Sequence, residues 1–281
     1  MDRSAIDVEA IRDFYDDFLT SRMVEYRLSR NLRIERAISR VLSYSRSDSR
    51  VLDIGCGIGV VAERVAKFAS RGHVYACDLS ERNIWYANQT IRLPNLTFKV
   101  VDAVHDLDAI QAWVGDRIDL VVLIDVLEHL PVTMHAEVFR AVREWLAEDG
   151  TVVLTFPSPA YQRFLKANDE HALQIIDEVI ELPHIVAVCS DAGLFMKHYS
   201  VEDIWMKNQY VHCVFQSTGD VKPIATVGAS LPVRVLSKAA LGARSVWQHQ
   251  FVRPWLRRKY VSRVFGSGYQ SASRATRPQD T

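Results

Sequence analysis

Apolar and polar residues form alternating blocks along the chain that predict strands and helices in turn. Short runs of β-branched and aliphatic residues are typical of buried strands, whereas apolar residues three and four positions apart are typical of helices. The strand-like runs are 51–54, 73–79, 96–103, 118–125 and 150–156, and the helical blocks between them are 60–69, 81–92, 106–114 and 134–147. Strands that alternate with helices predict a parallel sheet with right-handed crossovers.

The pattern changes after the fifth predicted strand. Residues 157–182 are too long for an ordinary connection and begin at the carboxyl end of a strand, so they are a candidate lid. A helix closed by Gly193 is predicted next, followed by a hairpin of two strands, 194–205 and 209–216. The sequence therefore predicts an α/β, Rossmann-like, doubly wound sheet of seven strands, parallel with an antiparallel edge hairpin.

The two ends of the chain differ from this alternating centre. Helical spacing runs through residues 5–43 and stops at a polar break, 43–49. We expect an N-terminal helical cap (1–47), an α/β domain (48–217) with the lid insertion 157–182, and a basic aromatic C-terminal extension (218–281) whose last residues have the composition of a disordered end.

Charge is distributed unevenly, although the net charge is zero. Residues 1–217 hold 23 Lys and Arg against 32 Asp and Glu, whereas residues 218–281 hold 11 against 2. Within 231–266, five aromatic side chains lie among eight basic residues. This composition predicts an anionic partner, either nucleic acid or an anionic membrane surface. Docking of the extension onto the chain's own acidic body is an equal alternative.

Cysteine spacing and hydropathy point to the cytoplasm. The four cysteines, Cys56, Cys77, Cys189 and Cys213, are widely spaced, which predicts buried free thiols and neither a disulfide frame nor a metal knuckle. No apolar run reaches the roughly 18 to 20 residues that span a bilayer. The acidic start, MDRSAIDVEA, lacks the basic and apolar regions of a signal peptide.

The stretch VLDIGCGIG, residues 51–59, places glycine at every second position between a strand and a helix. Glycine lacks a Cβ, so it adopts positive φ and lets a ligand lie against the main chain near the free N–H groups of a helix. The dinucleotide fingerprint G-x-G-x-x-G would need glycine where Val60 stands. Asp53 favours a ligand that carries an ammonium group. The stretch predicts a cofactor crevice, with a simple tight turn as the alternative.

Four more segments follow at the ends of the later strands: VYACDLS (74–80), VVDAVHDL (100–107), DLVVLIDVLEHLP (119–131) and LAEDGTVVLTFPSP (146–159). Together with the glycine turn, and in this order and spacing, they resemble the motifs of class I S-adenosylmethionine-dependent methyltransferases over residues 30–217. The resemblance implies S-adenosylmethionine as cofactor and methyl transfer as the reaction.

The resemblance also assigns residues to the cofactor. It places Asp78 at the ribose hydroxyls, Asp102 beside the adenine amino group and Asp53 at the methionine amino group, while Asp125 lies next to the sulfonium methyl. The predicted cofactor residues are Asp53, Gly55, Cys56, Gly57, Gly59, Asp78, Leu79, Asp102, Ala103 and Asp125. Helix or turn capping is the alternative role for Asp78 and for Asp102.

The end of the fourth strand limits the chemistry. It carries DVLE where methyltransferases of adenine or glutamine amide nitrogen carry an Asn- or Asp-Pro-Pro-aromatic tetrad. It also lacks the cysteine nucleophile that a methyltransferase of pyrimidine C5 would need there. Direct transfer to a hydroxyl, amine or carbon remains. For a hydroxyl, His129 and then His171 are the predicted bases, with His198 as a third candidate.

A metal site at the same place is an alternative that we do not favour. Asp125, Glu128 and His129 would converge on a helical turn, and their donor atoms suit Mg²⁺, Mn²⁺ or Zn²⁺. Metal-assisted hydroxyl methyltransferases carry a similar motif, but many relatives carry the Glu-His pair without a metal.

We therefore expect O-methylation of a small-molecule acceptor, such as a sugar, phenol or secondary metabolite. An RNA methyltransferase that uses the basic extension is the first alternative. A non-catalytic S-adenosylmethionine-binding partner subunit is the second. The sequence leaves the acceptor and the oligomeric state open.

Overall fold

The computed structural model describes residues 9, 11–14, 27, 31–115, 117–169 and 173–217. All of these except residue 27 belong to one compact unit. His171 and the extension 218–281 lie outside the described residues, as does most of the predicted helical segment before residue 31. The domain boundaries at 47 and 217 stay predictions.

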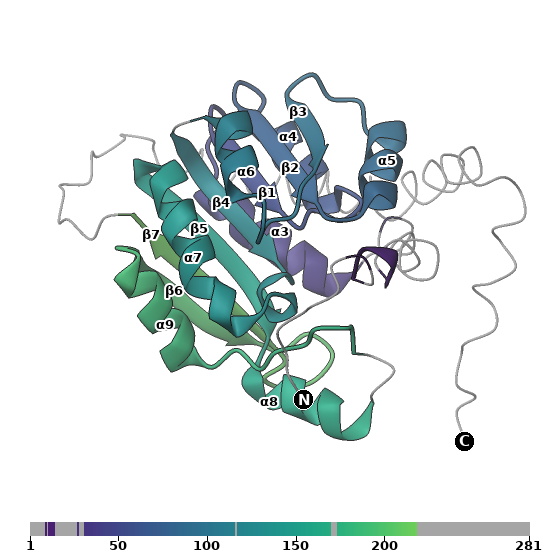
Figure 1. Ribbon diagram of the computed structural model, residues 1–281, viewed down its shortest axis with the longest axis vertical. Helices are drawn as coiled ribbons and strands as arrows, with labels where there is room; N and C mark the ends of the chain where they lie inside the picture. The colour runs from purple at the N-terminus through teal and green to yellow at the C-terminus, as the bar shows by residue number, and fades with distance from the viewer. Residues whose placement is uncertain are drawn as a thin grey trace, which may run out of the picture. The chain divides into compact units, whose positions relative to one another are not determined.

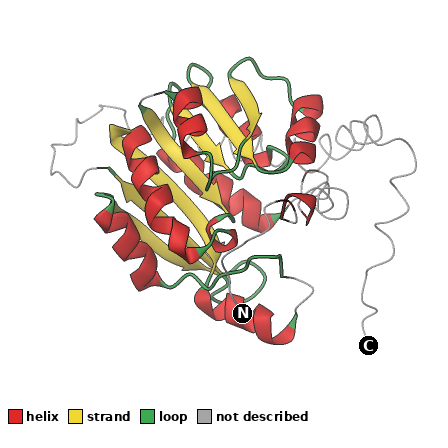
Figure 2. Cartoon of the chain, in the orientation of Figure 1, coloured by secondary structure: helices red, strands yellow, loops and turns green. Residues whose placement is uncertain are grey.

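A seven-stranded sheet forms the centre of the unit (Figures 1 and 2). Its strands are β1 (Arg50–Ile54), β2 (His73–Asp78), β3 (Leu96–Val100), β4 (Ile118–Ile124), β5 (Leu146–Pro157), β6 (Phe195–Glu202) and β7 (Tyr210–Gln216), in the spatial order β3-β2-β1-β4-β5-β7-β6. The first five strands pair in parallel, whereas β7 runs antiparallel to both β5 and β6. The predicted fold class is confirmed.

Helices cover both faces of the sheet, because the strand side chains on both faces are apolar. One core cluster packs α3 (Leu32–Tyr44), α4 (Val60–Phe68) and α5 (Glu81–Thr90) against one face. The other packs α6 (Leu107–Val114), α7 (His135–Trp145) and α9 (Leu182–Asp191) against the opposite face, which is turned to the viewer in Figure 1. Neighbouring residues of β1 divide between the clusters, since Val51 belongs to the first and Leu52 to the second.

Two details differ from the sequence prediction. Strand β5 begins at Leu146 and not at residue 150, so the preceding helix ends at Trp145. Leu146 is buried and pairs with Ile118, which draws the chain into the sheet before the regular register starts at Leu120 and Thr151. Residues 127–134 form two 3₁₀ turns, η2 (Leu127–His129) and η3 (Val132–Met134), where an α-helical turn was expected.

The candidate lid, residues 157–182, begins with α8 (Pro159–Asn168). Ser158 caps this helix by accepting a hydrogen bond from the N–H of Tyr161 at 3.1 Å. The residues that return from α8 towards α9, as far as they are described (173–181), have no regular secondary structure.

All four cysteines are buried and free, as predicted. Over the residues that the structure describes, no helix is both long enough and apolar enough to cross a membrane.

The contribution of the α7 face to stability is open to measurement. Trp145 is 1% exposed at the end of the buried stripe of α7, whereas Trp85 on α5 is 51% exposed. Trp145→Ala is expected to lower the free energy of unfolding by about 3–5 kcal/mol because it leaves a large cavity. Trp85→Ala should change it by no more than about 0.5 kcal/mol. Urea denaturation of both variants checks the contrast, and equal losses would contradict it.

Candidate active site

The glycine turn between β1 and α4 has the backbone that the sequence predicted. Gly55, Gly57 and Gly59 have φ values of 69°, 52° and 75°. A Cβ on Gly55 would lie 2.4 Å from Val126 Cγ2, and one on Gly59 would lie 2.8 Å from the Phe98 ring. Side chains are therefore excluded by conformation and by space. Cys56 attaches the turn to β2, because its main-chain N–H donates to the carbonyl of Cys77 at 2.9 Å.

Asp53 is a buried carboxyl group beside this turn. Asp53 is only 3% exposed, and within the described part of the chain its Oδ2 atom has no hydrogen-bond partner. Burial, with a smaller contribution from the charge of Asp78, raises the pKa of Asp53 to about 8, although the main-chain N–H of Ala62 opposes the shift. A buried polar atom without a partner is costly, so a ligand that donates a hydrogen bond here would stabilise the site.

Asp78, the last residue of β2, binds the glycine turn directly. Its Oδ2 accepts the N–H of Gly57 at 2.8 Å, and its Oδ1 accepts the N–H of Ser80 at 2.9 Å. The capping role that was the alternative for Asp78 belongs to Ser80, whose hydroxyl accepts the N–H of Asn83 at the start of α5 at 3.1 Å. The ribose role of Asp78 stays a prediction, as does cofactor binding by its half-buried neighbour Leu79.

Asp102 closes the turn after β3. Its Oδ1 accepts the N–H groups of Val104 at 2.8 Å and His105 at 3.1 Å, and its Oδ2 lies 2.8 Å from Nδ1 of His105. Burial raises the pKa of Asp102, but these hydrogen bonds outweigh it and hold the pKa below the usual value. The turn-capping alternative is therefore observed. Contact of Asp102 with adenine stays a prediction, as does cofactor binding by the half-buried Ala103.

Asp125 follows β4 with a φ of 56°, a left-handed conformation that is uncommon for residues other than glycine. Its carboxylate forms an ion pair with Arg33 of α3 and accepts the Thr155 hydroxyl at 3.1 Å. The Arg33 guanidinium also lies over the Tyr210 ring, 5.2 Å from the centroid. Sequence reasoning missed Arg33 and Thr155, because both contacts join segments that are distant along the chain.

His129 ends the 3₁₀ turn that follows Asp125. Its Nδ1 lies 2.7 Å from the carbonyl oxygen of Ile176 and 3.5 Å from Oδ1 of Asp177. Burial lowers the pKa of His129. Burial also raises the pKa of its buried neighbour Glu128 to about 8. His198, the third candidate base, lies on the edge strand β6 and contacts the Ser200 hydroxyl at 3.1 Å.

The candidate metal ligands Asp125, Glu128 and His129 do not form a ligand set. The left-handed backbone of Asp125 and the 3₁₀ geometry of η2 remove the α-helical turn on which the three side chains were expected to converge. Across the described ranges, no group of three or more His, Cys, Asp or Glu side chains is placed to hold a metal ion.

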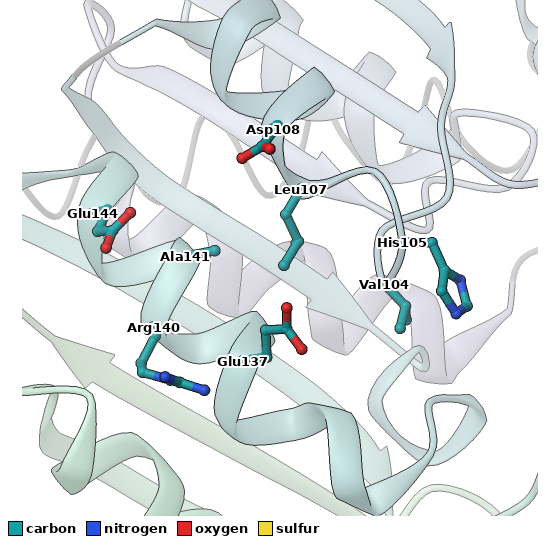
Figure 3. A pocket seen from close by; sticks show the side chains of 8 residues that line it. All are labelled: Val104, His105, Leu107, Asp108, Glu137, Arg140, Ala141 and Glu144. Carbon is teal, nitrogen blue, oxygen red and sulfur yellow. The ribbon is translucent and has the colours of Figure 1, made fainter. Parts of the chain in front are cut away.

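A pocket of about 340 Å³ lies on the face covered by α6 and α7, and Figure 3 shows its lining side chains. It is lined by Val104, His105, Leu107, Asp108, Glu137, Arg140, Ala141 and Glu144. None of the residues predicted to bind the cofactor or to act as a base lines this pocket.

Comparison with known proteins decides the family. The methyltransferase domain family matches residues 25–201. The chain belongs to this family. The resemblance to class I S-adenosylmethionine-dependent methyltransferases is thus confirmed, and with it S-adenosylmethionine as the methyl donor.

This methyltransferase is similar in sequence to the ubiquinone biosynthesis O-methyltransferases of two organisms. It is 36% identical over 81 residues to the ubiquinone biosynthesis O-methyltransferase of Roseobacter denitrificans, covering 29% of this chain and 31% of that protein. It is 27% identical over 158 residues to the protein of the same name from Leptothrix cholodnii, covering 53% and 65%. The chain therefore spans less than two thirds of either relative.

A solved structure shows the same fold. The magnesium protoporphyrin IX methyltransferase of Synechocystis PCC 6803, with bound SAH, matches with a TM-score of 0.59 over 75% of this chain and 100% of that one. The sequence identity is 16%, so this likeness concerns the fold alone.

The glycine turn and Asp53 fit the methionine end of S-adenosylmethionine. The bare main chain of the turn lets a ligand approach. The Asp53 oxygen that has no hydrogen-bond partner among the described residues would accept a hydrogen bond from an ammonium group. An ammonium group beside Asp53 would favour its ionised form and lower its pKa.

This fit predicts a pH dependence of product binding. Asp53, with a pKa of about 8, is mostly protonated at pH 7. An ammonium ligand binds the ionised form, so S-adenosylhomocysteine should release a proton at pH 7 and bind more tightly as the pH rises from 6 to 8. Calorimetry in buffers of different ionisation enthalpy measures the released proton. Asp53→Asn should abolish the release, whereas the exposed control Asp48→Asn should retain it.

A second prediction separates ligand binding from helix capping at the end of β2. Asp78→Ala is expected to weaken S-adenosylhomocysteine binding by about 1–3 kcal/mol, because two ribose hydroxyls lose their acceptor. Ser80→Ala removes the α5 cap and should lower stability by about 1 kcal/mol with little loss of affinity. Calorimetry and thermal melting measure the two effects. Unchanged affinity in a folded Asp78→Ala protein would remove the ribose role.

Proposed function

We propose that this methyltransferase transfers a methyl group to a hydroxyl group of a small-molecule acceptor, with His129 as the base. The observation that carries the proposal is the contact of 2.7 Å between His129 Nδ1 and the carbonyl oxygen of Ile176. A carbonyl oxygen only accepts hydrogen bonds, so Nδ1 carries the proton of the neutral ring. Nε2 is then the nitrogen that accepts a proton from the acceptor hydroxyl.

The cofactor supplies a methyl group on a positively charged sulfur. The chain's own residues would bind and orient it: Asp53, Gly55, Cys56, Gly57 and Gly59 at the methionine end, Asp78 and Leu79 at the ribose, and Asp102 and Ala103 at the adenine. Asp125 would lie beside the methyl group, and its carboxylate forms an ion pair with Arg33. Positioning of two reactants in this way is itself a large part of catalysis.

The protonation states of the neighbouring groups support a neutral base. Burial lowers the pKa of His129, so the ring is uncharged and able to accept a proton at pH 7. Glu128, whose pKa burial raises to about 8, is mostly protonated at the same pH and adds little negative charge. An imidazole that is neutral at the working pH is a suitable general base.

The names of the two curated relatives support a hydroxyl as the acceptor, since both are O-methyltransferases. Because the chain spans only part of their length, the ring or sugar that carries the hydroxyl stays open. The RNA and membrane alternatives depend on residues 231–266, which lie outside the described residues. The second base candidate, His171, also lies outside them, and a cytoplasmic location stays a prediction from the sequence.

The proposal predicts a loss of rate without a loss of cofactor binding. His129→Gln is expected to lower the rate of methyl transfer about 10²- to 10⁴-fold, because the hydroxyl proton loses its acceptor. The rate is measured as release of S-adenosylhomocysteine with a panel of phenols and hydroquinones, and affinity for S-adenosylhomocysteine should stay within about twofold.

A matched control is His73→Gln, which changes a histidine at the amino end of β2 that contacts Thr97. It should keep the wild-type rate. Full turnover of His129→Gln would contradict the role of this residue. Absence of methyl transfer to any hydroxyl acceptor, with S-adenosylhomocysteine still bound, would favour the non-catalytic alternative.

A further inference from the structure

The returning part of the candidate lid contacts the proposed base. We call residues 174–178 the return segment. Besides the Ile176 carbonyl at 2.7 Å, it brings the Asp177 carboxylate to within 3.5 Å of His129 Nδ1. The N–H of Glu178 donates to the carbonyl of Glu128 at 2.8 Å. The return segment is thus attached to η2 through a main-chain hydrogen bond to Glu128 and through contacts with the Nδ1 edge of the His129 ring.

Asp177 is itself held in place from the other side. Its Oδ1 accepts the side-chain amide of Gln162 at 2.9 Å, and its Oδ2 accepts the main-chain N–H of Gln174. Gln162 is 1% exposed on α8, so this anchor is buried. The Asp177 carboxylate therefore joins α8, the return segment and the side of His129 that carries the ring proton.

We infer that Asp177 is a positioning residue that, with the carbonyl of Ile176, holds His129 in the tautomer whose proton is on Nδ1. This inference rests on the proposed function of His129. The candidate lid would then do more than cover the site, because the docked return segment would select the nitrogen that accepts the proton.

The tautomer of His129 depends on the hydrogen-bond acceptors beside its ring nitrogens. A neutral imidazole carries its proton on either nitrogen, and the hydrogen bond made by one nitrogen determines the state of the other. Two oxygen atoms, a carbonyl and a carboxylate, lie beside Nδ1. The carboxylate at 3.5 Å is too distant for a good hydrogen bond, so it acts through its charge and as the anchor of the segment.

The same charge would help after proton transfer. When Nε2 takes the hydroxyl proton, the ring becomes a cation, which Asp177 stabilises and Arg33 opposes. On the Nε2 side, Oε1 of Glu128 lies 3.8 Å away, and burial holds this carboxyl group mostly protonated at pH 7. The two sides of the imidazole therefore differ. The Asp177 carboxylate lies on the Nδ1 side, and Nε2 is the nitrogen that accepts the proton.

The experiment observes the tautomer directly. The full chain is prepared with ¹⁵N-labelled histidine, and the ring nitrogens of His129 are assigned by comparison with His129→Gln. At neutral pH the wild-type protein should show the proton on Nδ1. In Asp177→Asn and in Gln162→Leu a fraction with the proton on Nε2 should appear.

Kinetics provide a second reading of the same variants. In both, kcat is expected to fall about 10- to 100-fold, because the ring is misplaced or in the wrong tautomer for part of the time. KM and affinity for S-adenosylhomocysteine should stay within about twofold. The control is Glu181→Gln, which removes one charge from the same lid at an exposed ion pair with Arg163 and should change neither the tautomer nor kcat.

The outcomes are distinguishable. A wild-type ring with its proton on Nε2 would overturn the inference without any variant. A folded Asp177→Asn protein whose tautomer and kcat equal those of the wild type would also overturn it, even if its melting temperature fell. A shifted tautomer in Asp177→Asn, combined with full turnover of His129→Gln, would uphold the positioning role and refute the base.

Discussion

The close approach of the glycine turn to the end of β4 is the constraint on which the site depends. Strands β1 and β4 are hydrogen-bonded neighbours, and at their carboxyl ends Gly55 lies so near Val126 that a Cβ would fall 2.4 Å from it. This contact places the glycine turn, which carries residues predicted to bind the cofactor, beside Asp125 and the 3₁₀ turn of His129. The absence of a side chain on Gly55 thus lets the predicted cofactor residues lie close to the proposed base.

Burial and the number of hydrogen-bond donors decide the protonation of three acidic side chains near these strand ends, Asp53, Asp102 and Glu128. Asp102 accepts several hydrogen bonds and its pKa falls, whereas burial raises the pKa values of Asp53 and Glu128 to about 8. The same residue type is therefore charged in one place and neutral in another at pH 7. A protonated Asp53 avoids a buried charge until a cationic ligand binds. A protonated Glu128 is likewise compatible with the interior beside the His129 imidazole.

The sequence was sufficient for the sheet because periodicity and strand ends are local signals. Alternation of strands and helices gave the fold class, and the glycine turn, Asp78 and Asp125 could be placed at one edge from their positions after strands. The contacts of Arg33 with Asp125 and of Asp177 with His129 were not predictable, since each joins segments that meet only in three dimensions. The 3₁₀ turn after β4 was also missed, because its sequence, DVLEH, suits an α-helical turn equally well.

The left-handed backbone of Asp125 restricts which residues can occupy that position. A φ of 56° is tolerated by glycine, asparagine and aspartate, and it is costly for branched or bulky side chains. Threonine, valine and isoleucine are therefore disfavoured at position 125 by the backbone conformation alone, whatever their charge. Asparagine is the replacement that removes the charge, keeps an acceptor for the Thr155 hydroxyl and preserves the turn. Few residue types are therefore compatible with the backbone conformation at position 125.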